Sequence, residues 1–376
     1  MISQQSNGLG LTFAELCEQF GLPPKQASGL RTSYRAAMIG SSNANSPDRQ
    51  ISKSDFNLTA GPHPIIRHKR DGELIKFVQR TPDGLETESV IIPMSKGGRN
   101  WHSLCVSSQV GCRMGCTFCE TAQLGLLRNL SAAEIVGQVI AARREFGVEV
   151  RKIVFMGMGE PFDNFDAVVQ AVRVLTDPYG LSLSKRQITI STVGRVEGIR
   201  RLASLGWQYL QLAVSLNAPN DEVRSQIMPV NRAEPMAALR EAMVEYPLRR
   251  NMYLMVEYVL IPGVNDAAEH ARELAVYLRP VKCCVNVIPY NPRRESPWPA
   301  PTDETVIAFL QNLRDAGQFC KRRITKGRDL MAACGQLGNR ELRPNRAAGS
   351  RPGQTEQTGR FEVSRPAPLT LDGSLR

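Results

Sequence analysis

Residues 152–175 read KIVFMGMGEPFDNFDAVVQAVRVL and contain one complete structural unit. The apolar run at 153–155 has the β-branched and aromatic residues of a buried strand. The run at 165–175 carries apolar residues at helical spacing. GMGEP, residues 157–161, lies between the two. A strand, a polar turn and a helix in this order predict an α/β fold.

The same alternation continues along the chain. Strand-like runs at 186–193, 209–217, 252–262 and 283–292 are each followed by helical segments. Several of these runs are apolar almost throughout, as in parallel strands covered on both faces. Six or so βα units in about 220 residues predict an incomplete, TIM-like (βα)6 barrel. A capping box, Ser131 with Glu134, indicates where its first helix begins.

Changes in composition predict four regions. Residues 1–45 form a small helical accessory region, and residues 46–98 a linker with a β-hairpin extension around a Pro-Asp-Gly turn. Residues 99–338 form the barrel core. Residues 339–376 are rich in Arg, Pro and Gly, with seven arginines and four acidic residues. We expect this tail to be disordered and basic.

Length and charge limit the class of protein. The chain has 376 residues, 42% of them hydrophobic, so it can build a large core. No apolar run approaches the roughly 18 residues of a membrane span, and the first residues lack the features of an export signal. We therefore expect a cytoplasmic protein. Its net charge of +11 favours a polyanionic partner, with nucleic acid as the first candidate.

The cysteines are unevenly distributed. Of nine, Cys105, Cys112, Cys116 and Cys119 lie close together in sequence, and the last three form C-x3-C-x2-C. Three thiolates in one loop can hold a 4Fe-4S cluster and leave one iron open to a substrate. The alternatives are a zinc site or coincidence. Zinc sites usually pair two C-x2-C blocks, and the chain has no second block.

Polar motifs follow most of the predicted strands. The cysteine loop, GMGEP, STVG, SLNAPND, PGVND and PYNP all occur where a strand ends. Active sites of βα barrels lie at the carboxyl ends of their strands. Motif position and predicted fold therefore indicate the same site.

These motifs resemble known families. C-x3-C-x2-C with Phe118 before its last cysteine resembles the signature of radical S-adenosylmethionine enzymes, and GMGEP resembles the motif by which they hold the methionine amino group. SLCVSSQVGC, SLNAPND, IPYNP and AACGQL together resemble the RlmN/Cfr family of RNA adenine methyltransferases. The resemblance covers roughly residues 85–338.

The resemblance implies a role for each matching residue. The cluster ligands are Cys112, Cys116 and Cys119. The residues matching S-adenosylmethionine contacts are Gly159, Glu160, Ser191, Ser215, Leu216, Asn217 and Asn291. Cys334 matches the methyl-carrying cysteine, Cys105 its resolving partner, and Glu88 a proton-accepting glutamate. Asn217 stands where the family usually has His, so it can donate a hydrogen bond but cannot carry a proton.

The resemblance also implies a mechanism. One S-adenosylmethionine methylates Cys334, and a second yields a 5′-deoxyadenosyl radical that takes hydrogen from this methyl group. The carbon radical adds to adenine. Cys105 then deprotonates the ring carbon and attacks Cys334, which leaves a disulfide that must be reduced. A flavodoxin- or ferredoxin-type protein would supply electrons to a monomeric enzyme.

The implied substrate is 23S rRNA, with tRNA as a further candidate and no role for DNA or a membrane. SSQVGC and GMGEP followed by Phe162 favour carbon 2 of adenine over carbon 8. Two alternatives stay open at this point. The first is the same radical chemistry on a different substrate. The second is a non-catalytic iron–sulfur protein that binds RNA and senses redox state.

Overall fold

The computed structural model describes residues 7–39 and 61–339. Seven neighbouring parallel strands form the central sheet and follow one another in chain order. They are β4 (Arg99–Cys105), β7 (Val150–Phe155), β8 (Ile188–Thr192), β9 (Gln211–Ser215), β10 (Leu254–Leu260), β11 (Cys283–Pro289) and the short β12 (Cys320–Arg322). Parallel neighbours in sequence order require a crossover after each strand.

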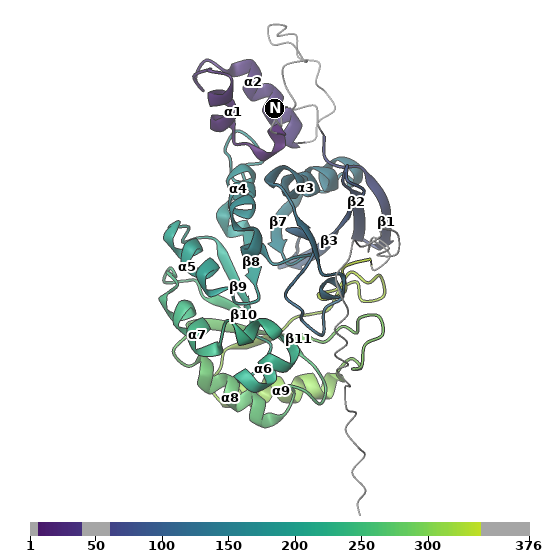
Figure 1. Ribbon diagram of the computed structural model, residues 1–376, viewed down its shortest axis with the longest axis vertical. Helices are drawn as coiled ribbons and strands as arrows, with labels where there is room; N and C mark the ends of the chain where they lie inside the picture. The colour runs from purple at the N-terminus through teal and green to yellow at the C-terminus, as the bar shows by residue number, and fades with distance from the viewer. Residues whose placement is uncertain (1–6, 40–60, 340–376) are drawn as a thin grey trace, which may run out of the picture. The chain divides into compact units, whose positions relative to one another are not determined.

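Helices provide these crossovers and lie outside the curved sheet (Figure 1). They are α3 (Ala132–Phe146), α4 (Phe165–Leu175), α5 (Val196–Ser204), α6 (Asp221–Ile227), α7 (Met236–Glu245), α8 (Ala268–Leu278) and α9 (Asp303–Asp315). The strands β4 and β7 to β11 are each followed by one or two of them. The predicted partial barrel of six βα units is therefore confirmed, and within the described residues β12 ends the sheet without pairing to β4.

An antiparallel extension continues the same sheet beyond β4. It consists of β1 (Ile65–Asp71), β2 (Leu74–Arg80) and β3 (Glu86–Lys96). The predicted Pro-Asp-Gly turn joins β2 to β3, where the Thr81 amide donates to the Leu85 carbonyl at 2.8 Å. The strand β1 and the long pairing of β3 with β4 were not predicted. The expected boundary at residues 98 and 99 falls at the turn between β3 and β4.

The first described residues form η1 (Gly8–Gly10), α1 (Phe13–Gln19) and α2 (Ser28–Ile39). Phe13 and Tyr34 are fully buried in the same apolar cluster as the barrel core. The Phe13 amide also donates to the Asp177 carboxylate at 2.6 Å. This helical region is thus joined to the barrel by a shared core. The tail predicted at 339–376 lies outside the described residues, except for Asn339.

Helix α3 begins at the predicted capping box. The Ser131 hydroxyl accepts from the Glu134 amide, and the Glu134 carboxylate accepts from the Ser131 amide. Among the described residues no helix is long and apolar enough to cross a membrane.

Candidate active site

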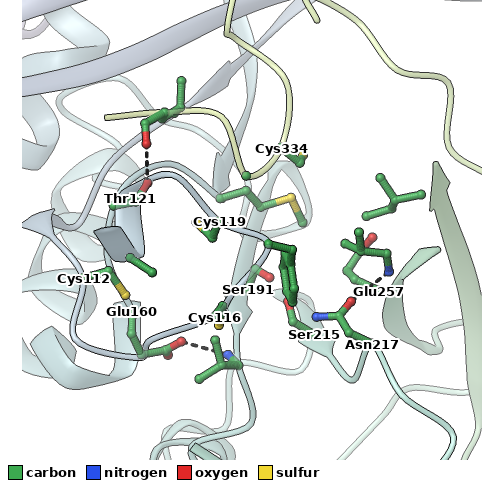
Figure 2. A pocket seen from close by; sticks show the side chains of 18 of the residues that line it. Cys112, Cys116, Cys119, Thr121, Glu160, Ser191, Ser215, Asn217, Glu257 and Cys334 are labelled. Carbon is green, nitrogen blue, oxygen red and sulfur yellow. Dashed lines mark hydrogen bonds between the residues drawn. The ribbon is translucent and has the colours of Figure 1, made fainter. Parts of the chain in front are cut away.

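One pocket lies at the carboxyl ends of the parallel strands. Its lining comes from the cysteine loop after β4, the ends of β7 to β11, Arg323 just after β12 and the segment around Cys334 (Figure 2). Of the residues that the sequence implicated, those in the lining are Cys112, Cys116, Cys119, Gly159, Glu160, Ser191, Ser215, Asn217, Asn291 and Cys334. Cys105, Glu88 and Leu216 are not in it. Residues from distant parts of the chain therefore meet at the predicted edge of the barrel.

The cysteine loop is held at its base by a small sheet that the sequence did not reveal. Strand β5 (Gln109–Gly111) pairs antiparallel with β6 (Leu126–Asn129). The Cys112 amide donates to the Gly125 carbonyl at 2.9 Å. Gly111 has a φ of +75°, and a Cβ there would lie 1.9 Å from the same carbonyl. Only glycine therefore fits beside the first cysteine.

The three loop cysteines favour an iron–sulfur cluster over a single metal ion. Burial and the neighbouring sulfurs raise the pKa of the Cys112 thiol to about 12, and the pKa values of Cys116 and Cys119 are also raised. Buried thiols of this kind become stable thiolates only beside positive charge such as a metal. No three His, Cys, Asp or Glu side chains in the described ranges are placed to share one ion. A cubane binds each thiolate to its own iron, so these residues fit that group.

Glu160 and Gly159 form the next wall. Glu160 is almost fully buried, and its carboxylate accepts from the Val193 amide at 2.8 Å and the Phe162 amide at 3.0 Å. Burial nevertheless raises its pKa to about 7. Gly159 has a φ of +99°, and a Cβ there would lie 2.6 Å from the Cβ of Gln109. The carboxylate is therefore fixed in a site suited to a ligand ammonium group.

The remaining predicted cofactor contacts differ in what they do. Ser191 and Ser215 line the pocket from β8 and β9. Asn217 adopts a φ of +59° and accepts from the Val259 amide at 2.9 Å, so its oxygen joins the end of β9 to β10. The side-chain amide of Asn291 donates to the Cys334 carbonyl at 3.4 Å. Leu216 is fully buried and does not line the pocket.

Arg224 supports the loops that follow β8 and β9. The sequence did not indicate this role. Its guanidinium is fully buried and donates to the carbonyls of Leu216 and Val193 and to the Asn231 side chain. Val193 is the residue whose amide binds Glu160. One planar fork therefore connects the ends of β8 and β9. A lone Arg in an amphipathic helix gives no sequence signal for such a role.

Cys334 and Cys105 lie near one charged group. Burial, with a smaller electrostatic contribution from the Cys334 side chain, raises the pKa of Cys105 to about 12. The electrostatic influence of Cys334, Glu257 and Cys105 raises the pKa of Arg323, whose guanidinium lies 3.5 Å from the Glu257 carboxylate. The segment carrying Cys334 is bound to the cysteine loop, because the Glu120 amide donates to the Gly335 carbonyl at 2.7 Å. The structure thus places Cys334 in the pocket wall, on a segment bound to the cysteine loop.

Glu257 and Arg323 were not predicted. Their side chains lie 3.5 Å apart, and Glu257 also accepts from the Asn286 side chain at 3.0 Å. Glu257 interrupts the otherwise apolar strand LMVEYVL at 254–260. A carboxylate in a buried strand needs a partner, so this residue carried a signal that could have been used. Arg323 has no comparable signal in the sequence.

Glu88 does not reach the pocket. It lies buried in β3, where its carboxylate contacts the Lys76 ammonium at 2.7 Å and accepts from the Gly338 amide at 2.9 Å. Its carboxylate is therefore bonded to Lys76 and to the segment that carries Cys334, outside the pocket lining.

The pocket lies in a partial barrel, between a three-cysteine loop and the GMGEP turn. This is the site of a radical S-adenosylmethionine enzyme. The family model of the radical SAM superfamily matches residues 106–275. A crystal structure of a radical SAM methyltransferase from Sphaerobacter thermophilus is 39% identical, with a TM-score of 0.78 over 87% of this chain and 98% of that one.

Two relatives of this chain are named as one particular kind of radical S-adenosylmethionine enzyme. The chain is 43% identical to a probable dual-specificity RNA methyltransferase RlmN 1 of Protochlamydia amoebophila, over 89% of this chain and 90% of the relative. It is 44% identical to the dual-specificity RNA methyltransferase RlmN of Campylobacter jejuni, over 76% of this chain and 83% of the relative. This chain belongs to the RlmN family of radical SAM methyltransferases.

Proposed function

We propose that the chain methylates carbon 2 of an adenine in 23S rRNA, and also acts on tRNA, through a methyl group carried by Cys334. The names of its relatives support RNA as the substrate. The observation that carries the cysteine route is the position of Cys334. It lines the pocket together with the three loop cysteines and Arg323.

The chain's own residues have distinct parts in this proposal. Cys112, Cys116 and Cys119 would hold the 4Fe-4S cluster, and Glu160 would bind the amino group of S-adenosylmethionine. When bound, these two groups supply the methyl group and the one-electron chemistry, with two S-adenosylmethionine molecules used per turnover. Cys334 accepts and carries the methyl group. Cys105 attacks Cys334 to release the product as a disulfide forms.

Arg323 has a definable task in the same route. A thiolate is the reactive form of cysteine, and a nearby cation stabilises it. Arg323 lines the same pocket as Cys334 and is paired with the Glu257 carboxylate at 3.5 Å. Family membership further supports a cytoplasmic monomer that receives electrons from a flavodoxin- or ferredoxin-type protein.

The test compares Cys334→Ala with Cys320→Ala. Cys320 is a buried cysteine whose sulfur contacts the Leu310 carbonyl outside the pocket. Nucleoside mass spectrometry of rRNA and tRNA should show loss of the methyladenine with the first variant and normal levels with the second. Methylation that persists without Cys334 contradicts the carrier route. A methyl group on carbon 8 contradicts the assigned carbon.

A further inference from the structure

The segment at residues 331–338, which carries Cys334, is bound on one side by two buried charged residues of the antiparallel extension. Lys76 in β2 is opposite Val90, and Glu88 in β3 is opposite Val78, so the two side chains lie diagonally across the strand pair on the same face. The Lys76 ammonium contacts the Glu88 carboxylate at 2.7 Å and donates to the Met331 carbonyl at 2.9 Å. The Glu88 carboxylate accepts from the Gly338 amide at 2.9 Å. The pair therefore holds both ends of this segment.

Other contacts fix the middle of the segment. The Thr121 hydroxyl donates to the Leu337 carbonyl at 2.6 Å, and the side-chain amide of Gln336 donates to the Pro292 carbonyl at 2.9 Å. Thr121 lines the pocket and Pro292 directly follows the lining residue Asn291, whereas Lys76 and Glu88 lie in the antiparallel extension. A buried ion pair is costly to form and is weak evidence for stability by itself. The pair contacts both ends of the segment that carries Cys334, which favours a role in positioning this segment over a role in stability.

We propose that Lys76 and Glu88 are positioning residues that hold the Cys334 sulfur within reach of Cys105. The inference rests on the proposed function, because it concerns the disulfide that ends the reaction. It also assigns Glu88 a role other than accepting a proton from the substrate. Its carboxylate oxygen already receives Lys76 and Gly338.

The step that reports on this role is thiol–disulfide exchange. Two glutathione thiols reduce the Cys105–Cys334 disulfide, giving two cysteine thiols and one glutathione disulfide. The equilibrium depends on how often the two protein sulfurs meet, since closing the disulfide is an intramolecular reaction. Loosening the segment should therefore favour the reduced form without changing either cysteine.

The experiment uses the full chain with its cluster, equilibrated in glutathione buffers of graded ratio. Alkylation and mass spectrometry of the unmethylated chains then give the disulfide fraction. The double variant Lys76→Met/Glu88→Gln removes both buried charges together, so that neither is left uncompensated. We expect its equilibrium to shift toward the dithiol by about tenfold or more. The single variant Lys76→Arg keeps the charge and should retain much of the wild-type value.

The matched control is Arg67→Met in the same extension. It removes the half-exposed Arg67 side chain from the buried Glu86 carboxylate, which keeps Arg80 as its partner. It should leave the equilibrium unchanged. If the double variant folds, by circular dichroism and denaturant unfolding, and keeps the wild-type equilibrium, the positioning role is wrong. A wild-type chain that never forms the disulfide would instead contradict the proposed function as well.

A second, independent observation concerns the opposite edge of the barrel. Six cations lie in the segments that precede or begin β8 to β12, together with four aromatic rings. We call this set the amino-edge surface, and it comprises Lys185, Arg186, Arg249, Arg250, Lys282, Lys321, Trp207, Tyr209, Tyr253 and Phe319. No carboxylate in the described ranges forms an ion pair with any of these cations, although many other arginines of the barrel are paired.

The cations and rings contact each other. The guanidinium groups of Arg186 and Arg249 lie 4.3 Å and 3.9 Å from the centre of the Tyr209 ring. Lys185 lies 5.2 Å from the Trp207 ring, and Lys321 lies 5.6 Å from the Tyr253 ring. Two guanidinium groups on one ring are like charges within about a Debye length of each other. A bound anion would relieve this repulsion.

We infer that the amino-edge surface is a second contact surface for RNA. Arginines and lysines without ion pairs beside accessible rings are what phosphate groups and unstacked bases bind. Phe319 is 56% exposed, and Trp207, Tyr209 and Tyr253 are partly exposed. The surface lies at the strand ends opposite the pocket, so an RNA that touches both must extend around the barrel. A short RNA that only fills the pocket would not reach it.

The test compares Arg186→Glu/Arg249→Glu with Arg173→Glu/Arg272→Glu, an equal charge change on helices α4 and α8. The probes are a long 23S rRNA transcript and a short hairpin containing the target adenine. We expect the first variant to lose about tenfold or more in affinity for the long transcript, with a shallower salt dependence, and to methylate the hairpin normally. Equal affinities of the two variants for the transcript overturn the inference. A defect of the first variant that appears only in its binding to an acidic electron-donor protein also overturns the inference, because the surface then binds that protein and not RNA.

Discussion

Single residues determine whether the pocket can accept its cofactor. Gly159 and Glu160 are adjacent in sequence but contribute in different ways. The first allows a backbone conformation and a close approach that a side chain would prevent, and the second provides a buried carboxylate. Both were predicted from the GMGEP motif. Their environment was not, because the Val193 amide that fixes Glu160 comes from the next strand.

Replacing Gly159 by Ala should abolish measurable S-adenosylmethionine binding. Its Cβ would lie 2.6 Å from that of Gln109, and the φ of +99° is strained for alanine. Gly206→Ala is the matched control, because that residue has a φ of +66° and no atom within 4 Å of the place a Cβ would occupy. Isothermal titration of the cluster-loaded proteins provides the measurement. Similar affinities in both variants would mean that the close approach of Gly159 to Gln109 does not govern binding.

The affinity for S-adenosylmethionine should rise with pH through about 7. Burial raises the pKa of Glu160 to about 7 from an ordinary value of 4.5, so the carboxyl is protonated below this range in the ligand-free protein. Only the carboxylate attracts the ammonium group, so binding weakens as pH falls. Glu160→Gln should bind weakly and show a flatter profile from about pH 6 to 8. A steep profile in this variant would assign the titration to another group.

At the scale of elements, the small β5–β6 sheet holds the base of the loop that carries the three-cysteine motif. The spacing of the three cysteines is local and could be read from the sequence. The sheet that holds the loop is made of two very short strands without clear alternation, so no periodic pattern revealed it. The extension β1 to β3 was foreseen only as a hairpin, although it continues the barrel sheet.

Gly111→Ala should prevent normal cluster assembly. Its Cβ would collide with the Gly125 carbonyl, which also binds the Cys112 amide. We expect the iron content after reconstitution to fall several-fold and the cluster absorbance with it. Gly125→Ala tests strain alone, since that residue has a φ of +68° and no atom within 4 Å of a Cβ. Full iron content in Gly111→Ala would show that the loop does not depend on this pairing.

At the scale of the whole molecule, charge is unevenly shared. Residues 1–338 carry most of the net positive charge, and the tail at 339–376 has three more arginines than acidic residues. Nonspecific affinity for RNA depends on how many phosphates are neutralised. The pocket and the amino-edge surface both belong to the barrel, so the barrel should dominate recognition.

Deleting residues 343–376 should therefore weaken RNA binding only modestly, by about threefold at physiological salt, with a slightly shallower salt dependence. Turnover with saturating RNA should stay unchanged, because the deletion begins after Gly338, the residue whose amide binds Glu88 at the end of the Cys334 segment. Fluorescence anisotropy and methyl transfer assays measure the two effects. A loss of turnover would place a catalytic contribution in the tail.

The sequence by itself determined the order of the βα units, the edge of the barrel that carries the site and the three-cysteine loop. Each of these follows from periodicity or spacing within a short stretch of chain. Tertiary structure alone decided which side chains meet across long separations. Arg224 under the pocket, Glu257 with Arg323, and Lys76 with Glu88 behind Cys334 depend on packing between distant elements. A buried charge reveals its need for a partner in the sequence, but only the fold shows which partner it has.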